Sequence, residues 1–234
     1  MRNSQRAVAA ALGVIVVLMV VAAIWFRVAA PEPPELSGER TTRTYDYADF
    51  RGVEVTGQWQ VTIQRGDDWR VSVEAPVEII DQIRVQRQRD GDAVDLEGPW
   101  WLVESEGEEG GLQATITMPA LESLDVSGTS MTSFSGFDGA ELSLDLSGGG
   151  QLRGTASRFD SLVLDMSGAA EIDLDDVPVT DAEVDISGAG NVKLRMAGGR
   201  LTGDLSGVAN LEYSGTVSAE TIDRSGPVSV RRRE

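Results

Sequence analysis

The sequence predicts an all-β protein, a single-stranded parallel β-solenoid with about 20 residues per rung, preceded by one N-terminal transmembrane helix. Three observations support this fold class. A five-residue pattern recurs at nearly constant spacing in the second half of the chain, apolar and polar residues alternate around each copy, and the chain opens with a long uncharged apolar run.

The apolar run predicts a membrane anchor. Residues 7–26 hold no charged side chain, and about 20 apolar helical residues span the ~30 Å hydrocarbon core of a bilayer. Two of the residues before the run are arginines, and basic residues favour the cytoplasmic side. We therefore expect a cytoplasmic tail at 1–6 and a single-pass anchor at 7–27. A cleaved signal peptide is the alternative, because residues 28–30 are small enough for a cleavage site.

A polar segment follows the anchor. Pro31-Glu-Pro-Pro-Glu35 favours an extended, stiff conformation, and the chain has no periodicity from there to about Arg43. We interpret residues 28–44 as a Pro-rich linker between the membrane and the main domain at 45–234.

The pattern apolar-Asp-x-Ser-Gly organises the main domain. It occurs six times from residue 121 onward, and its serines are 20, 20, 20, 19 and 19 residues apart. The six aspartates are Asp125, Asp145, Asp165, Asp185, Asp204 and Asp223. A fixed period of this length is the mark of a stacked-repeat architecture.

Each copy reads as two short strands joined by a glycine turn. Leu144 and Leu146 fall on one face of a strand, and Asp145 and Ser147 fall on the other. One repeat is too small to bury its apolar face, so each strand is expected to pair in parallel with its copy one repeat later. A helical repeat is disfavoured, since Ser-Gly would interrupt it every time.

Residues 45–121 show the same alternation with a weaker period, so the whole domain is expected to contain nine or ten rungs. Tyr45, Tyr47 and Phe50 are candidates to close the N-terminal end. At the other end, Arg224 stands where the earlier copies have an apolar residue, which is typical of a terminal rung.

Composition excludes several functions. The chain has no cysteine and no histidine, which rules out disulfides, thiol nucleophiles, His-ligated zinc and a Ser-His-Asp triad. The formal net charge of -18 makes nucleic acid an unsuitable partner, because phosphate contacts need clustered basic residues.

The sequence resembles the head GIN domain family of putative auto-transporter adhesins over about residues 45–230. The resemblance rests on Phe50-Arg-Gly-Val-Glu-Val-Thr-Gly57, on Ile116-Thr-Met-Pro-Ala-Leu121 and on the Ser-Gly-Ala-Gly-Asn-Val192 type of repeat. It implies a right-handed parallel β-helix, a bacterial exported protein with an envelope or surface role, and no catalytic residues.

Stacking would place the six aspartates in one column, where neighbouring carboxylates repel each other by about 1 kcal/mol in water and by more near a protein surface. The simplest interpretation is a structural ladder whose carboxylates accept local hydrogen bonds. A second is Ca²⁺ bound between rungs, since hard cations prefer clustered oxygens. A third is a catalytic carboxylate pair.

The sequence therefore favours a non-enzymatic module, anchored in the cell membrane with its main domain periplasmic or at the cell surface. We expect it to act in binding, adhesion or scaffolding, with an envelope glycan or protein as partner and with the aspartate column as the candidate binding site. The alternative is a glycan-active hydrolase or lyase that uses paired aspartates.

Overall fold

The computed structural model describes residues 34–88, 91–99, 101–102 and 111–233. The predicted tail at 1–6 and anchor at 7–27 lie outside these residues. Within the described part of the chain, no helix is long and apolar enough to cross a membrane. Residues Leu36–Glu234 form one compact unit, whose described residues are mainly strands, with a short 3-10 turn η1 at Ile80–Gln82.

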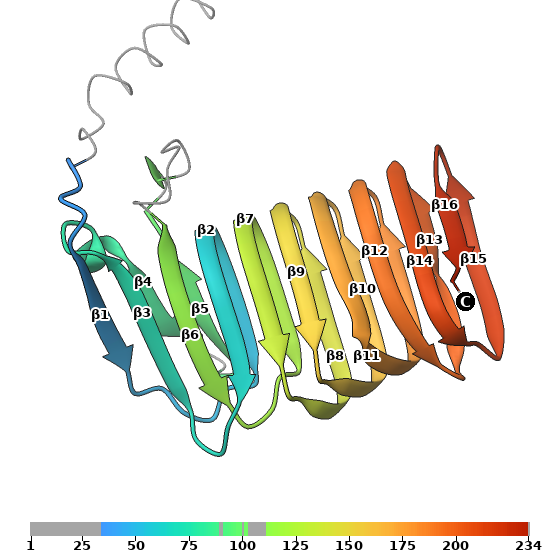
Figure 1. The fold of residues 1–234 in the computed structure, drawn as a ribbon, viewed down its shortest axis with the longest axis horizontal. Coiled ribbons are helices and arrows are strands. Elements are labelled where there is room, and N and C mark those ends of the chain that lie inside the picture. The colour runs from blue at the N-terminus through green and yellow to red at the C-terminus, as the bar shows by residue number, and fades with distance from the viewer. Residues whose placement is uncertain (1–33, 89–90, 100, 103–110, 234) are drawn as a thin grey trace, which may run out of the picture. The chain divides into compact units, whose positions relative to one another are not determined.

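Figure 1 shows the strands of this unit stacked side by side as the turns of a solenoid. In chain order they are β1 (Arg40–Tyr45), β2 (Gly52–Arg65), β3 (Arg70–Pro76), β4 (Arg84–Arg87), β5 (Ala93–Glu97), β6 (Leu112–Met118), β7 (Ser123–Ser135), β8 (Asp138–Leu146), β9 (Gly149–Thr155), β10 (Arg158–Met166), β11 (Ala169–Ile186), β12 (Ala189–Ala197), β13 (Arg200–Ser206), β14 (Val208–Thr216), β15 (Ala219–Ser225) and β16 (Ser229–Arg232).

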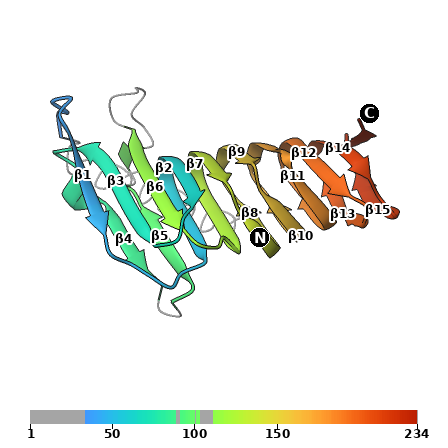
Figure 2. The same cartoon turned by 60° about the horizontal axis from the view of Figure 1, so that its bottom comes forward.

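The strands form two faces that enclose the core. Face A runs β4-β5-β2-β7-β8-β10-β11-β13-β15, and face B runs β1-β3-β6-β2-β7-β9-β11-β12-β14-β16. The long strands β2, β7 and β11 contribute one half to each face. Figure 2, turned from the view of Figure 1, shows both layers along the stack.

The register confirms the predicted stacking. Leu144 pairs in parallel with Leu124 on one side and with Leu164 on the other, and Asp145 pairs in the same way with Asp125 and Asp165. From β7 to β16 the chain makes about six such turns. The alternation of apolar and polar residues places one set of side chains in the core and the other in solvent.

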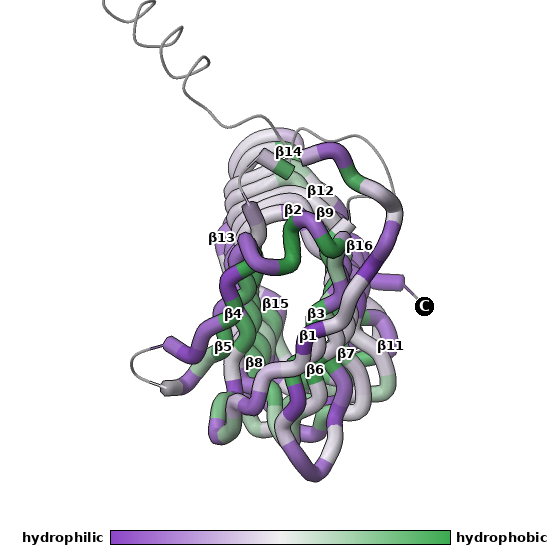
Figure 3. Tube along the Cα trace, turned by 90° about the vertical axis from the view of Figure 1, so that its left-hand side faces the viewer, coloured by the Kyte–Doolittle hydropathy of each residue, from purple (hydrophilic) through white to green (hydrophobic). Residues whose placement is uncertain are grey.

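The core fills the space between the two faces. Its members are almost all aliphatic, with Phe50, Phe134, Phe137 and Phe159 as the largest fully buried side chains. Figure 3 looks along the stack at the tube of the chain, coloured by hydropathy, which surrounds this interior. Each fully buried aliphatic or aromatic side chain stabilises the fold by roughly 1.5–3 kcal/mol relative to exposure.

Thr132 and Gly154 interrupt the apolar alternation, and the structure explains both. Thr132 is buried and its Oγ1 lies 3.1 Å from the Oγ of Ser130, so the two hydroxyls satisfy each other. Gly154 lies beneath the ring of Phe134, which occupies the space that a side chain at 154 would need. Phe134 also meets Phe159 edge to face, with ring centroids 6.3 Å apart.

The glycines of the repeat form a column at the corner between the faces. A Cβ added to Gly128, Gly148, Gly168 or Gly188 would overlap the carbonyl oxygen of the corner glycine one rung earlier. At this corner the backbones of successive rungs come so close that only a glycine, which has no side chain, fits between them. This close approach is the physical reason for a glycine after each serine.

The N-terminal third differs from the prediction. The rung made of β5 and β6 pairs with the outer side of β2, while β7 pairs with the inner side, so the order of rungs in space is not the order in sequence. Beyond it, β4 pairs antiparallel with β5, and β3 pairs antiparallel with β6. The expectation of nine or ten parallel rungs over 45–234 is thus wrong, because alternation predicts a strand but not the direction in which it pairs.

The predicted linker is also shorter than residues 28–44. Residues Arg40–Tyr45 form β1, which pairs antiparallel with β3 at the edge of face B. Arg40 donates a 2.7 Å hydrogen bond from its Nε to the Oε1 of Glu74, which fixes this strand to its neighbour. The sequence 40–45 is polar because β1 is an edge strand with little apolar surface to bury.

Polar side chains cover both ends of the solenoid. At the N-terminal end the rings of Tyr45 and Tyr47 stack 6.1 Å apart, and the Tyr47 hydroxyl donates a 2.9 Å hydrogen bond to the Val85 carbonyl on the outermost strand of face A. At the C-terminal end, the Tyr213 hydroxyl donates to Glu220 at 2.6 Å, and Glu220 also accepts from Arg224 at 3.1 Å. Arg224 pairs in register with Leu205, as expected for a charged terminal rung.

Candidate functional site

The six aspartates of the repeat form one column on the outside of face A. The register pairs Asp125 with Asp145, Asp145 with Asp165, Asp165 with Asp185, and Asp204 with Asp223. The backbone N–H of Asp204 donates a 2.8 Å hydrogen bond to Asp185 Oδ1, which joins the two halves of the column. The structure therefore brings together all six predicted residues.

Two further acids extend the column beyond the predicted set. Glu54 on β2 pairs with Asp125 on one side and with Asp95 on β5 on the other. Both were missed because the repeat was read only from residue 121 onward. The signal was present, since Val53-Glu-Val-Thr-Gly57 and Val94-Asp-Leu-Glu-Gly98 carry the same apolar-acid-x-x-Gly arrangement.

The two members at the N-terminal end of the column, Asp95 and Glu54, accept hydrogen bonds from other side chains. The amide of Gln86 donates to Asp95 Oδ2 at 3.1 Å, and the amide of Gln88 donates to Glu54. Asp95 Oδ1 is buried without a hydrogen-bond partner among the described residues. The N-terminal end of the column is thus held by glutamines of β4 and of the segment after it.

The surroundings of Asp125 change the pKa of its carboxyl. Desolvation by its surroundings, followed by the negative charges of Asp145 and Glu54, raises the pKa of the Asp125 carboxyl above its usual value. In contrast, the backbone N–H of Arg200, with a smaller contribution from its side chain, lowers the pKa of Asp181 on the same face. Face A therefore holds one carboxyl whose pKa is raised and another whose pKa is lowered.

A shallow hollow follows the centre of the column. It has a volume of about 450 Å³ and is lined by Asp145, Asp165, Asp185 and Asp204, with Ser167, Ser187 and Ser206 beside them. Among the described residues, no group of three or more acidic side chains is arranged to hold a metal ion. The carboxylates lie in a row along the stack, whereas a cation needs oxygens that converge on one point.

The charged side chains on the outside of face B are arranged differently from those on face A. One column there runs Arg153, Asp173, Lys193, Glu212 and Arg231, so that the sign changes at every rung. Opposite charges on neighbouring strands stabilise a sheet by roughly 0.2–1 kcal/mol per pair, and like charges destabilise it. This column of face B therefore neutralises its own charges, while the column on face A is a row of acids alone.

Comparisons with known proteins agree with this architecture. The family model described as "Putative auto-transporter adhesin, head GIN domain" matches residues 49–217 and 163–233. No curated protein matches the chain.

The chain is similar to solved structures from several bacteria. A putative adhesin from Bacteroides fragilis superposes with a TM-score of 0.66 at 14% identity, covering 86% of this chain and 100% of that one. A putative adhesin from Parabacteroides merdae gives 0.46 at 11% identity, covering 85% and 98%. A putative lipid binding protein from Parabacteroides distasonis gives 0.44 at 13% identity, covering 85% and 98%. At 14% identity, the likeness to the Bacteroides fragilis protein is one of fold.

Proposed function

The chain belongs to the head GIN domain family of putative auto-transporter adhesins, and from this membership we propose that it is an exported binding module of the bacterial cell envelope, acting in adhesion or as a scaffold. The carrying observation is the stacked register, which repeats equivalent outward side chains at the strand spacing of about 4.8 Å. A surface of this kind suits a partner that is itself repetitive, because many weak contacts form together.

The proposal includes a location. The segment 7–27, whose residues 7–26 carry no charge, serves as a single-pass anchor, and the arginines before it keep the tail at 1–6 in the cytoplasm. The solenoid then lies on the extracytoplasmic side, and the short Pro-rich segment before β1 holds it away from the bilayer. The partner is an envelope glycan or an envelope protein.

Nothing in the described structure favours the alternative of a glycan hydrolase or lyase. A general acid needs a raised pKa next to the scissile bond, but Asp125, whose pKa is raised, does not line the central hollow. That hollow also contains no basic side chain that would attract an acidic polysaccharide.

Cell fractionation tests the location. Full-length protein is followed in membranes of the producing bacterium, and protease is added outside intact spheroplasts. The proposal predicts that the chain remains with the membrane and that the solenoid is cut or labelled from outside. Recovery in the soluble cytoplasm would contradict it, and a mature N-terminus near Ala30 would replace the anchor with a cleaved signal.

Cell attachment tests the function. Cells that produce the full-length chain are compared with cells that lack it for retention on surfaces coated with purified envelope material. We expect several-fold greater retention with the chain present. Equal retention in both strains would contradict a role in adhesion.

A further inference from the structure

Among the residues that the structure describes, one part of face B has no charged side chain, although the chain as a whole has a formal net charge of -18. It lies where β6, β2 and the second half of β7 run side by side (Figure 1). Its outward residues form a grid with Gln113, Gln60 and Met131 in one row and Thr115, Thr62 and Ser133 in the next. We call these six residues the neutral patch.

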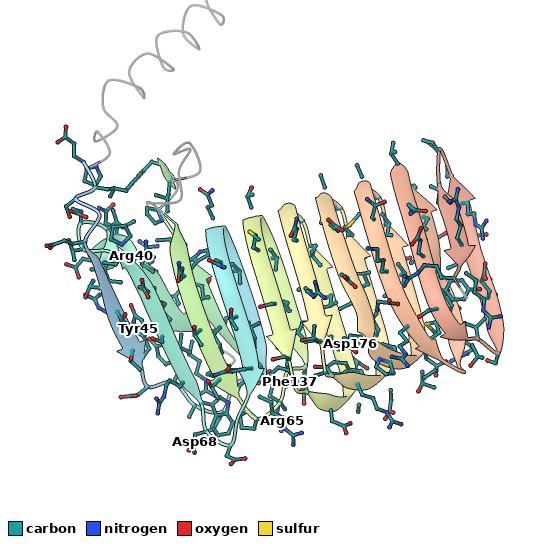
Figure 4. The ribbon with its side chains drawn as sticks, in the orientation of Figure 1. Arg40, Tyr45, Arg65, Asp68, Phe137 and Asp176 are labelled. Carbon is teal, nitrogen blue, oxygen red and sulfur yellow. The ribbon has the colours of Figure 1, made fainter. Side chains whose placement is uncertain are left out.

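The residues next to the neutral patch mark its limits. A third uncharged row continues the grid, with Gln64 donating a 3.1 Å hydrogen bond to Thr117 Oγ1. The flanking strands restore charge, with Glu74 on β3 beside Gln113 and Arg153 on β9 beside Ser133. Figure 4 shows how the outward side chains of these neighbouring strands project from the ribbon.

The groups of the neutral patch have free hydrogen-bonding capacity. Among the described residues, the side chains of Gln60, Gln113, Thr62 and Thr115 make no hydrogen bond to another protein group. A glutamine amide offers two donors and an acceptor, and a threonine hydroxyl offers one donor and two acceptors. The strands hold these groups at fixed spacing, so little backbone freedom is lost when a partner binds.

The neutral patch also contains an unusual apolar side chain. Met131 is 57% exposed, and few large hydrophobic residues of the described chain are exposed at all. It lies between Gln60 and Gln151 in the register. A flexible thioether flanked by amides can pack against an apolar surface of a partner whose polar groups meet the amides.

We propose that the neutral patch binds an uncharged glycan. Sugar hydroxyls both donate and accept hydrogen bonds, which matches the amides and hydroxyls of the grid, and the C–H surface of a sugar ring matches Met131. A cationic partner would instead be drawn to the acids of face A, and an anionic one would be repelled by the net charge. An uncharged partner is the one class for which desolvating this patch leaves no charge unpaired.

This assignment rests on the proposed function, and it names the partner class and the face that a binding module would use. Because the contacts involve no charge, the affinity is expected to change by less than about twofold between low and high salt. Binding at the aspartate column would instead weaken steeply as salt rises.

The experiment uses the full-length chain in detergent micelles on an array of neutral, uronic-acid and amino-sugar oligosaccharides, with insoluble cellulose and mannan as further probes. The test variant is Gln60→Ala/Thr62→Ala. The matched control is Asn191→Ala/Asn210→Ala, which removes two stacked polar residues elsewhere on face B.

We expect neutral glycans to be retained, with at least a tenfold loss in the test variant and wild-type binding in the matched control. Met131→Ala should also weaken binding, and circular dichroism verifies that each variant is folded. Binding restricted to charged glycans, or neutral binding that the test variant keeps, would overturn the proposal. So would an absence of glycan binding together with a dimer that the test variant dissociates, which would assign the patch to a second copy of the chain.

A chain that binds no glycan but still increases cell attachment would overturn only the glycan assignment. A chain that binds neutral glycans but does not change attachment would contradict the adhesive role and leave the assignment intact. The two experiments therefore test the adhesive role and the glycan assignment independently.

Discussion

Faces A and B share one core but differ in how they handle charge outside it. On face A the column from Asp95 and Glu54 to Asp223 repeats the same sign at every rung, whereas on face B the column from Arg153 to Arg231 alternates. Both faces bury mainly apolar side chains on the inside. Since both charge patterns occur on one stack, we infer that the core and the corner glycines stabilise the stacking. The outward charges can then vary with only a small effect on stability.

The largest effect is expected at the corner that joins the faces. In Gly148→Ala the new Cβ would overlap the Gly128 carbonyl oxygen, so the rungs must separate. We expect a loss of at least about 3 kcal/mol in the free energy of unfolding, or failure to fold. Chemical denaturation measures it.

The neighbouring glycine supplies the control for that measurement. A Cβ at Gly149 meets its nearest atom, the Ala169 carbonyl oxygen, at 3.5 Å, and the next two rungs already carry alanine at this position. Gly149→Ala should therefore change stability by less than about 1 kcal/mol. Equal effects of the two substitutions would show that the corner column does not set the spacing of the rungs.

Removing one acid from each face should change the stability by a smaller amount and in opposite directions, which tests the contrast between the two charge columns. Asp165→Asn removes a charge between Asp145 and Asp185, while Asp173→Asn removes one between Arg153 and Lys193. The first should stabilise and the second destabilise the fold, each by about 0.2–1 kcal/mol at low salt. Thermal unfolding at two salt concentrations measures both shifts, which should shrink as salt rises; shifts of the same sign would refute the contrast between the faces.

The smallest effect concerns pH. The folded state raises the pKa of Asp125 above its ordinary value of 3.8, so the native chain holds this proton more tightly than the unfolded chain. Its contribution to stability is present below the unfolded pKa and is lost as pH rises through the folded pKa. Asp125→Asn should therefore be more stable than the wild type at neutral pH, and the difference should vanish below about pH 3.8.

Asp181 gives the matching control, because the hydrogen bond from the Arg200 backbone lowers its pKa. Its stabilising contribution is present above the unfolded pKa and is lost as pH falls through the folded one. Asp181→Asn should be less stable than the wild type at neutral pH, and the deficit should disappear in acid. The same pH trend for both variants would contradict the opposite pKa shifts of Asp125 and Asp181.

Much of the C-terminal two thirds could be predicted from the sequence. The period fixed which residues share a column, and the structure pairs Leu124, Leu144 and Leu164 as expected. This worked because a repeat that cannot bury its own apolar face must stack on its copies. The repeat pattern identified the corner glycines. The physical reason for them, the close approach of successive backbones, is visible only in the structure.

The N-terminal third could not be predicted in the same way. Its strands were visible as alternation, but β5 and β6 pair on the far side of β2, and β1, β3 and β4 run antiparallel to their neighbours. Alternation fixes which side chains face inward, whereas partner and direction depend on the connecting segments. The neutral patch was missed for a related reason, because it joins β6, β2 and β7, which only this rearrangement brings together.

The stacking register is the central claim, and a pair of cysteines tests it most directly in a chain that has none of its own. Neighbouring strands lie about 4.8 Å apart, within the Cα separation of about 4.4–6.8 Å that a disulfide allows. Mild oxidation of Asp145→Cys/Asp165→Cys, one rung apart, should close an intramolecular disulfide in the monomer, and Asp145→Cys/Asp185→Cys, two rungs apart, should not. Equal cross-linking of both pairs, or closure of the second alone, would contradict the stack.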